Sequence, residues 1–599
     1  MTSTAAGDSP DPRSSKPALG DPSERSLPRG ELRRHVAAFL GAVARASNSR
    51  RIYVVVAAVS AVIAVTTFGQ IRLNEWQRDF YDALEQRHFD DLLVQLGVFV
   101  AIIAVLLILQ VAQSWLGGTL KVGLRSAIST DVLDEWLQPR RAYQLGWAGE
   151  VGHNPDQRIQ EDTRHLCELC GDLGIGLLQS SLLLVSFVGV LWGLSEHVTL
   201  AYGGYRFEIP GYMVWCAVAY AAAGSWATWR VGRPLVALNA EHYAREADFR
   251  FALVHTNEAA EAIGLNDGER DTRQELGTSL DRVLAIQRRI VRGLADLTWV
   301  TAGYGWLALV VPIVVAAPGY FSGTLTFGEL MMVTGAFFQV QQSLRWFVDN
   351  FAAIADWRAT LLRVMALRLV LPRIDPLGVK AGRIGFEPHP EGRLALEGLI
   401  VALPDKRVGL ADGRFELAPG DRVLISGGPG RGKSMLFRAI AGLWPWGTGR
   451  VLLPPADRTA FLPQRPYLPI GTLRKAIAYP LPPATFSDSD VHAAMERVGL
   501  PHLSRHLDED RRWDKELAVE EQQALAFSRL LLQRPRWVLM DNPLNALDGA
   551  RRADLMRVFE HELADSAVLA VGRSSAAAPP ECHVMELVEI PNGVGETAP

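Results

Sequence analysis

The feature that most constrains the fold is a series of long apolar runs in the first 350 residues. Each run is close to the ~20 residues that an α-helix needs to cross the hydrocarbon core of a bilayer. A buried helix of a soluble protein is the alternative, but four of the runs carry almost no charge over this length. We therefore predict a membrane domain of about six helices. The runs lie near residues 52–70, 93–113, 172–194, 210–230, 297–317 and 327–350.

The connections between these runs differ in length and charge. Those after the first, third and fifth runs are short, whereas those after the second and fourth are roughly 55 and 65 residues long and rich in Arg. The segment before the first run carries Arg33, Arg34, Arg45, Arg50 and Arg51. The positive-inside rule places the N-terminus and both long connections in the cytoplasm. We expect these connections to extend the helices inward and to end in short turns that contact a cytoplasmic domain.

The sixth run becomes polar toward its C-terminal half, and two interpretations stay open. Ionisable groups at membrane depth are costly unless they line water or find partners. The helix either forms the wall of a substrate cavity or has already left the bilayer by Arg345. The polar residues are Gln339, Gln341, Gln342, Arg345, Asp349 and Asn350.

Composition excludes several classes of protein. The net charge of -4 gives no global positive field for nucleic acid. Four cysteines cannot form a secreted disulfide framework, and Cys167 and Cys170 make a single CxxC without a second pair, which favours a helix face over a zinc site. The first 30 residues are rich in Pro, Ser and Gly, predict a disordered tail and show no signal peptide pattern.

A phosphate-binding loop opens the second half of the chain. From about Leu394 the sequence changes to short strands, turns and polar helices, and Gly427 to Ser434 reads G-x-x-x-x-G-K-S between an apolar strand and a helix. This context is the one that a P-loop requires, because its backbone N–H groups and the helix N-terminus bind phosphate oxygens. We expect Lys433 to reach the β/γ-phosphates of ATP and Ser434 to bind Mg²⁺. The predicted nucleotide-binding residues of the loop are Gly427, Gly428, Pro429, Gly430, Arg431, Gly432, Lys433 and Ser434.

Further motifs follow in order. Phe461 to Gln464 resembles a Q-loop, whose glutamine senses Mg²⁺, and Trp537 to Asp541 is an apolar strand that ends in a Walker B aspartate. Ala546-Leu547-Asp548 matches a D-loop. With the membrane runs before them, these motifs resemble those of ABC transporters. The resemblance implies ATP and Mg²⁺ as cofactors, with Gln464 and Asp541 joining Ser434 around the metal.

Two segments of the membrane half resemble one branch of that family. Leu73-Asn-Glu-Trp-Gln-Arg-Asp-Phe-Tyr-Asp-Ala-Leu84 and Asn154-Pro-Asp-Gln-Arg-Ile-Gln-Glu-Asp162 look like the SbmA/BacA-like branch with a fused ATPase domain, which is related to the peroxisomal acyl-CoA transporters of subfamily D. The resemblance implies a dimer of half-transporters in the bacterial plasma (inner) membrane, with a cytoplasmic nucleotide-binding domain and a hydrophilic cargo such as a peptide. Taken alone, Asn154-Pro155 is also a helix-start signal.

The catalytic motifs depart from the family pattern. The signature L-S-x-G-E-Q-Q-R is Leu517 to Ala524 here, so Ala518 replaces the serine and Glu520 replaces the glycine that should approach a phosphate. Asn542 occupies the position of the water-activating glutamate, and Val571-Gly572-Arg573-Ser574 lacks the switch histidine. Loss of a general base typically costs about 10²–10⁴ in rate. In addition, no aromatic residue lies near Asp405 to Val408, where relatives stack adenine.

These observations predict an exporter-type six-helix membrane domain followed by an α/β P-loop domain. The predicted segments are a disordered tail at 1–30, a transmembrane domain at 31–370, a linker at 371–392, an ABC nucleotide-binding domain at 393–590 and a tail at 591–599. We expect a homodimer, with a heterodimer of two half-transporters as the alternative, because the losses in one chain would weaken both composite sites.

Two functions remain open. The first is a transporter that moves a solute with feeble ATP turnover, in which Gln464 and Asn542 stand at the catalytic positions. The second is a proton-coupled or nucleotide-regulated transporter whose ATPase domain does not hydrolyse. A soluble P-loop regulator does not account for the membrane runs.

Overall fold

The structure is a computed structural model, and it describes most of the chain between residues 29 and 590. The described ranges are 29–146, 155–195, 200–202, 205–207, 209–371, 382–403, 405–411, 413–428, 430–542, 544–572 and 582–590. The chain divides into two compact units, one formed by Met1–Glu135 with Asn154–Leu369 and the other by Trp136–His153 with Val370–Pro599.

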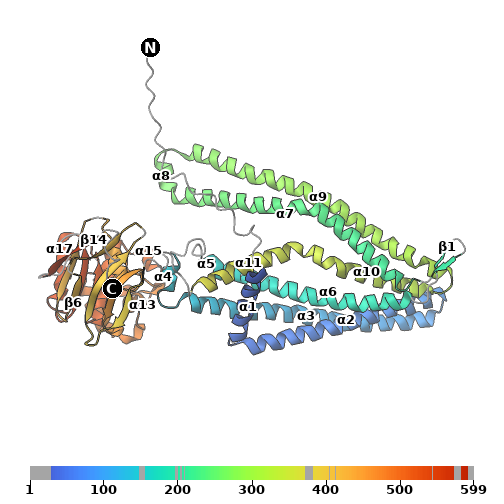
Figure 1. Cartoon of the computed structure of the whole chain (residues 1–599), viewed down its shortest axis with the longest axis horizontal. Helices are drawn as coiled ribbons and strands as arrows, with labels where there is room; N and C mark the ends of the chain where they lie inside the picture. Colours follow the sequence, from blue (N-terminus) through green and yellow to red (C-terminus); the bar gives the residue numbers. More distant parts are fainter. Residues whose placement is uncertain are drawn as a thin grey trace, which may run out of the picture. The chain divides into compact units, whose positions relative to one another are not determined.

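Long helices build the first unit (Figure 1). The described residues of this unit also contain one two-stranded antiparallel sheet, formed by β1 (Leu200–Tyr202) and β2 (Tyr205–Phe207). The helices are α1 (Arg29–Arg45), α2 (Ser49–Glu85), α3 (Phe89–Trp136), α5 (Pro155–Gln157), a π-helical turn η3 (Arg158–Asp162), α6 (Thr163–Ser195), α7 (Tyr212–Glu258), α8 (Ala260–Leu265), α9 (Glu269–Phe321), α10 (Phe327–Asp349) and α11 (Phe351–Val370).

All six predicted apolar runs lie in helices of this unit. Of the described helices, α2, α3, the helix that runs from Pro155 to Ser195, and α9 are long and apolar enough to cross a membrane. The runs at 210–230 and 327–350 lie in α7 and α10, which fall short of that measure of length and composition. That these two also span the bilayer stays a prediction.

Helix α10 lies at the centre of the packing in this unit. Val333, Ala336, Phe337 and Val340 are fully buried, and they contact apolar side chains of α6, α7 and α9. In contrast, α3 exposes a row of large apolar side chains such as Leu107, as expected for a face in contact with lipid. α7 and α9 run side by side (Figure 1).

The second unit contains a mixed sheet with helices around it. The strand order is β3-β8-β4-β5-β14-β7-β13-β12-β9, with β6 paired to β4. β14, β7, β13, β12 and β9 are parallel neighbours, whereas β4 is antiparallel to β5, β6 and β8. The strands are β3 (Gly385–Pro388), β4 (Leu394–Ala402), β5 (Arg407–Leu410), β6 (Arg414–Leu417), β7 (Arg422–Ser426), β8 (Gly447–Leu453), β9 (Thr459–Leu462), β12 (Trp537–Asp541), β13 (Ala567–Gly572) and β14 (His583–Ile590).

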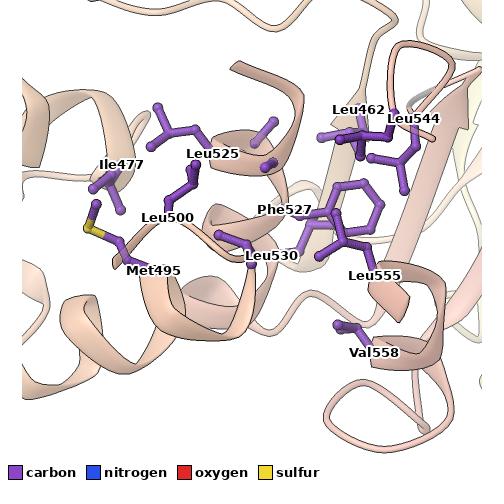
Figure 2. Packing of buried hydrophobic residues seen from close by; sticks show 14 of the residues in the cluster. Leu462, Ile477, Met495, Leu500, Leu525, Phe527, Leu530, Leu544, Leu555 and Val558 are labelled. Carbon is purple, nitrogen blue, oxygen red and sulfur yellow. The ribbon is translucent and has the colours of Figure 1, made fainter. Parts of the chain in front are cut away.

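The helices of this unit pack on the buried parallel strands. β12 and β13 are buried along their whole length, as expected for parallel strands covered on both faces. Figure 2 shows Phe527 and Leu530 of α16 close to Leu555 and Val558. The helices are α4 (Arg141–Leu145), α12 (Lys433–Ile440), α13 (Leu473–Ala478), α14 (Asp488–Arg497), α15 (Trp513–Glu516), α16 (Val519–Gln533) and α17 (Gly549–Met556), and a small pair is formed by β10 (Gly471–Thr472) and β11 (Asp510–Arg511).

The predicted segment boundaries need correction. β3 lies within the predicted linker 371–392, yet it pairs with β8, so the sheet begins before residue 393. The described residues 136–146 group with the second unit although the prediction placed them in the membrane domain. α1 begins at Arg29, just inside the predicted tail, while the rest of that tail, residues 372–381 and the tail 591–599 lie outside the described residues.

Candidate functional site

The P-loop lies between β7 and α12, as the sequence predicts. Gly432 is the N-cap of α12 and has a φ of 86°, a left-handed conformation that favours glycine. A Cβ on Gly432 would lie 3.2 Å from both Cγ atoms of Val408 and 3.3 Å from Cδ1 of Leu403. Glycine therefore lets the loop curl closely over the sheet. Pro429 lies outside the described residues.

Lys433 is placed where a triphosphate would meet the loop. Its side chain is only 8% exposed, and Nζ donates to the carbonyl oxygens of Gly427 at 2.5 Å and Gly428 at 2.7 Å. These carbonyls compensate the buried ammonium within the loop. The side chain thus presents a fixed positive charge at the N-terminal end of α12.

Ser434 and Asp541 meet at one edge of the sheet. β7 and β12 are both parallel neighbours of β13, so their carboxyl ends lie at the same edge. Ser434 Oγ donates to Asp541 Oδ1 at 3.2 Å. Burial raises the pKa of Asp541, and the Ser434 hydrogen bond and the positive charges of Arg438 and Lys433 oppose this rise. A hydroxyl beside a carboxylate fits Mg²⁺, which prefers oxygen ligands and is held in proteins by one or two carboxylates with phosphates.

Lys433 and Ser434 line an open cavity of about 590 Å³, and Asp541 lies behind Ser434. Gln464 also lines it, so the structure brings the Q-loop glutamine to the P-loop as predicted from its motif. The residues around the cavity are Leu403, Asp405, Lys406, Gly430, Arg431, Gly432, Lys433, Ser434, Met435, Gln464, Asn542 and Asn545.

Asn542 lies next to Asp541 on the same cavity. Its φ is 44°, a left-handed conformation that asparagine tolerates better than most residues, and its backbone N–H donates to the carbonyl of Val571 at 2.9 Å. The backbone is therefore anchored, and the side chain at this position is an amide. An amide can orient a water molecule but cannot accept its proton.

The signature segment forms the first turn of α16. Ala518 is the N-cap and offers no side-chain oxygen, while its backbone N–H donates to Glu521 at 3.0 Å. Glu521 also pairs with His502 at 3.0 Å. Glu520 is exposed in this first turn, so it adds negative charge at the helix end that would otherwise attract a phosphate.

Gln523 connects three parts of the site, and this role was not predicted from the sequence. It is 2% exposed, and its Nε2 donates to the backbone oxygen of Gln464 at 3.0 Å and to Oδ1 of Asn545 at 2.8 Å. Its Oε1 accepts the backbone N–H of Ala546 at 3.3 Å. One amide thus joins α16, the Q-loop and the D-loop.

The D-loop aspartate has a structural role in this chain. Asp548 is the N-cap of α17 and accepts the backbone N–H of Arg551 at 2.8 Å. Arg552 donates to the carbonyls of Leu544 at 2.9 Å and Leu547 at 2.7 Å. The switch segment is described only at Val571 and Gly572, so Arg573 and Ser574 lie outside the described residues.

Helix α4 packs on the nucleotide-binding unit. Arg140, just before it, lies over the ring of Phe386 at 5.5 Å, and Arg438 of α12 lies 6.0 Å from the ring of Tyr143. Leu145 is 1% exposed. The connection after the second run therefore includes a short element on this domain, as predicted, and the same expectation for the connection after the fourth run stays a prediction.

In the membrane unit, residues 73–84 link α2 to α10. Asp82 accepts the backbone N–H of Gly328 at 2.7 Å and the hydroxyl of Thr326 at 3.1 Å, and Asn74 donates to the carbonyl of Met332 at 3.0 Å. Thr326 also forms a capping box with Glu329 at the start of α10. The segment therefore fixes the central helix of the unit.

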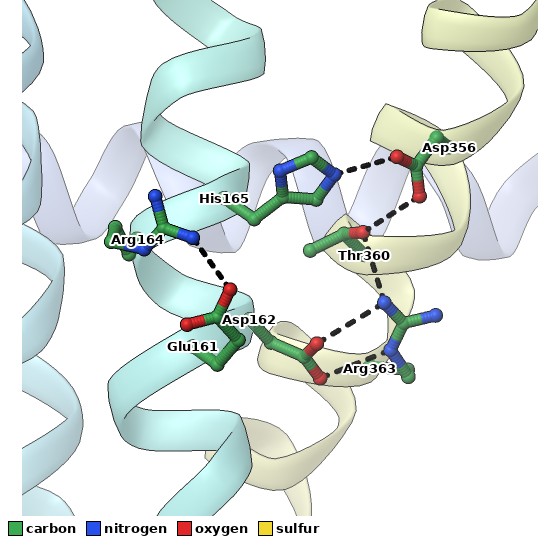
Figure 3. Close-up of polar contacts among 7 residues, drawn as sticks. All are labelled: Glu161, Asp162, Arg164, His165, Asp356, Thr360 and Arg363. Carbon is green, nitrogen blue, oxygen red and sulfur yellow. Dashed lines mark hydrogen bonds and ion pairs between the residues drawn. The ribbon is translucent and has the colours of Figure 1, made fainter. Parts of the chain in front are cut away.

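The described part of the second segment, residues 155–162, and the start of α6 contact α11 (Figure 3). Helix α5 begins at Pro155, as the Asn-Pro signal predicts, although Asn154 itself is not described. The segment then forms a π-helical turn that ends at Asp162, which receives two hydrogen bonds from Arg363 at 3.0 and 3.2 Å. His165 pairs with Asp356 at 2.6 Å.

The cysteine pair lies on a helix face, as predicted. Cys167 is buried on α6, and Cys170 accepts a hydrogen bond from Trp357 Nε1 at 3.2 Å. These thiols belong to the packing between α6 and α11.

Comparisons with known proteins agree with both halves of this description. Residues 43–321 match the family "ABC transporter transmembrane region 2", and residues 410–545 match the family "ABC transporter". The chain is 28% identical over 531 residues to the inner membrane ABC transporter ATP-binding protein YddA of Escherichia coli, covering 88% of this chain and 92% of that protein.

Two further relatives belong to subfamily D. The chain is 27% identical to the chloroplastic ABC transporter D family member 2 of Arabidopsis thaliana, over 84% of this chain and 79% of the relative. It is 24% identical to the lysosomal cobalamin transporter ABCD4 of Homo sapiens, over 71% of this chain and 73% of the relative.

Among solved structures, a bacterial Atm1-family ABC exporter with ATP bound shares the fold. The TM-score is 0.64 at 16% identity, and the match covers 91% of this chain and 92% of the exporter. With a helical membrane region and an ABC ATPase domain in one polypeptide, the chain is an ABC-type half-transporter.

Proposed function

We propose that this half-transporter binds ATP with Mg²⁺ tightly, hydrolyses it slowly, and moves a hydrophilic solute across the bacterial inner membrane as a homodimer. The observation that carries the proposal is the composition of the cavity. It keeps groups that would hold a nucleotide, Lys433 and Ser434 with Asp541 hydrogen-bonded behind it, but presents the amide of Asn542 where a base is needed.

The binding part rests on residues that one rigid edge of the sheet brings together. Lys433 would neutralise the β/γ-phosphates, while Ser434 and Asp541 would hold Mg²⁺ and Gln464 would face it from the Q-loop. Mg²⁺ supplies charge neutralisation on the phosphates when bound. Lys433, Ser434 and Gln464 line the cavity, and Asp541 is hydrogen-bonded to Ser434.

The hydrolysis part is weakened in two independent ways. Asn542 cannot accept a proton from the attacking water, which typically costs about 10²–10⁴ in rate. Ala518 offers no hydroxyl, and Glu520 places a negative charge on the helix end that should approach the γ-phosphate in a dimer. Because both defects lie in the same chain, a homodimer carries them in each of its two sites.

The chemical class of the transported solute is inferred from the relatives. The human relative is named for cobalamin and the sequence resembles a branch with hydrophilic cargo, so we propose a peptide or a corrinoid as the solute class. The resemblance to YddA supports the inner membrane as the location.

Uptake by cells or proteoliposomes that carry the Lys433→Ala variant tests the proposal. A variant that cannot hold the triphosphate should lose transport, whereas a surface control such as Lys475→Ala, on α13, should retain it. Transport that is unchanged in Lys433→Ala would remove ATP from the mechanism.

A second function is favoured by the same substitutions. If Ala518, Glu520 and Asn542 together abolish turnover, the nucleotide can only regulate, and a proton gradient would supply the energy. An uncoupler added at constant ATP should then collapse uptake. Uptake that ignores the gradient would exclude this alternative.

A further inference from the structure

A second cavity lies in the membrane unit, between α2 and α3. Both helices are long and apolar enough to cross a membrane, and the cavity between them has a volume of about 210 Å³. Apolar side chains line it, among them Ile52, Val55 and Val122, and so do polar ones, among them Asn48 and Arg51. The described lining residues include no carboxylate. The cavity therefore combines an apolar wall with a cation.

The depth of the cavity corresponds to one surface of the bilayer. Arg51 directly precedes the apolar run 52–70, and the positive-inside rule predicts that this end of α2 faces the cytoplasm. Tyr53 of α2 and Trp115 of α3 are exposed near the cavity, and the carbonyl of Trp115 accepts the hydroxyl of the lining residue Thr119 at 2.9 Å. Exposed Tyr and Trp gather at membrane–water interfaces. The cavity thus lies at the level of the lipid headgroups.

Arg51 offers an uncompensated positive charge at this level. Its side chain is exposed and forms no hydrogen bond or ion pair with any described residue. By contrast, Arg45 at the end of α1 lies 3.7 Å from the carboxylate of Asp131. A guanidinium without a partner can bind a phosphate through two parallel hydrogen bonds. The cavity is therefore suited to a ligand that carries a phosphate.

Asn48 adds a hydrogen-bond acceptor that lacks a donor. It is the N-cap of α2, but its side chain does not cap the helix, and Nδ2 donates instead to the carbonyl of Gly123 at 3.2 Å. Its Oδ1 is buried and finds no hydrogen-bond partner among the described residues. Buried acceptors are nearly always paired with protein, water or a ligand. A hydroxyl group of a bound ligand would supply the donor.

We propose that this cavity binds one phosphatidylglycerol molecule from the cytoplasmic leaflet. Its phosphate would contact Arg51, a glycerol hydroxyl would donate to Asn48, and an acyl chain would lie along Val55 and Val122. Basic pockets between membrane helices on the cytoplasmic side are typical binding sites for anionic lipids. A soluble glycerol phosphate shares the headgroup chemistry, but it would leave the apolar wall uncovered. The proposal concerns neither the nucleotide nor the solute, so it stands independently of the proposed function.

The test is native mass spectrometry of the detergent-solubilised, delipidated full chain without nucleotide. The chain is titrated with phosphatidylglycerol, phosphatidylcholine and glycerol phosphate, and we expect phosphatidylglycerol to bind about tenfold tighter than either of the other two. Arg51→Gln should weaken phosphatidylglycerol by about tenfold, the effect of losing a charge-assisted hydrogen bond.

Two further variants locate the bound lipid. Arg50→Gln is the matched control, because Arg50 is the exposed neighbour that does not line the cavity, and its loss should change the affinity by less than about threefold. Val122→Phe should weaken phosphatidylglycerol, since the larger ring occupies part of the cavity. Val122 is 70% exposed, so this change should leave the fold intact.

Four results would overturn the inference. Equal losses in Arg50→Gln and Arg51→Gln would mean that general surface charge attracts the lipid. Phosphatidylcholine that binds as tightly as phosphatidylglycerol would show that the headgroup charge is not recognised. Glycerol phosphate that binds as tightly as the lipid would make this a site for soluble anions. Unchanged affinity in Val122→Phe would mean that the lipid does not enter the cavity.

Discussion

Replacing Gln523 by leucine should break the hydrogen bonds that join α16 to the Q-loop and the D-loop, while the fold stays intact. The side chain is buried, and it makes hydrogen bonds to Gln464, Asn545 and Ala546. Leucine has a similar volume, so the cavity left behind is small. The main effect is then the loss of these hydrogen bonds.

The size of the effect follows from their number. An intramolecular hydrogen bond contributes about 0.5–1.5 kcal/mol net, so the three bonds of Gln523 amount to roughly 3 kcal/mol. For a domain of about 200 residues this lowers Tm by roughly 6–12 °C. Because Gln464 and Asn545 line the cavity, the affinity for Mg²⁺-nucleotide should fall as well.

The neighbouring Gln522 provides a matched control. It lies on the same helix and donates to Asp514 at 3.2 Å and Leu517 at 2.9 Å, away from the Q-loop and D-loop. Gln522→Leu should lower Tm in thermal unfolding of the full chain but leave nucleotide affinity unchanged. Equal losses of affinity in the two variants would refute the positioning role of Gln523.

Three further predictions concern other parts of the chain. Gly328→Ala should strongly lower the thermal stability of the purified protein, because its Cβ would meet a backbone oxygen of α2 at 2.1 Å, whereas Gly97→Ala, with nothing within 4 Å, should not. A double-mutant cycle on Asp162→Ala and Arg363→Ala should give a coupling free energy of unfolding of about 1 kcal/mol, because the arginine side chain is 46% exposed and the carboxylate is 12% exposed. A coupling near zero would contradict a stabilising contact between Asp162 and α11. Burial raises the pKa of Asp541 above its value in the unfolded chain, so the free energy of unfolding falls as the pH rises from the unfolded-state pKa through the folded-state pKa. Asp541→Asn removes this charge and should raise Tm at neutral pH without Mg²⁺. The same substitution should abolish Mg²⁺-dependent nucleotide binding. In the unmodified protein the affinity for Mg²⁺-nucleotide should fall as the pH is lowered below this raised pKa, because a proton then competes with Mg²⁺ for the carboxylate.

The architecture was predictable because its signals are local. Apolar runs of about 20 residues and a Gly-rich loop between a strand and a helix depend on short windows of sequence. The meeting of Lys433, Ser434 and Asp541 also follows, since parallel strands end at a common edge. These parts of the site needed only motif order and topology.

Other features depend on distant partners that a sequence does not reveal. Gln523 lies 59 residues from Gln464 and 22 from Asn545, and Asp82 lies 246 residues from the backbone N–H that it accepts. The resemblance identified the segment around Asp82 but not its role in fixing α10. β3 is four residues long and lacks an apolar alternation, so its place in the sheet was missed.

One missed feature did have a local signal. Thr326-Phe-Gly-Glu329 has the Thr-x-x-Glu spacing of a capping box, and both of its hydrogen bonds are present at the start of α10. The spacing marks the beginning of that helix at Phe327.

The most direct test of the account is Mg²⁺-dependent ATP binding and hydrolysis by the detergent-solubilised protein, measured beside Lys433→Ala. The account predicts binding that Lys433→Ala abolishes and turnover barely above that variant, because Asn542 cannot act as a base. Asn542→Glu should then raise turnover if the base is the main loss. Rapid hydrolysis by the unmodified protein would contradict the account, since another group would have to replace the missing carboxylate.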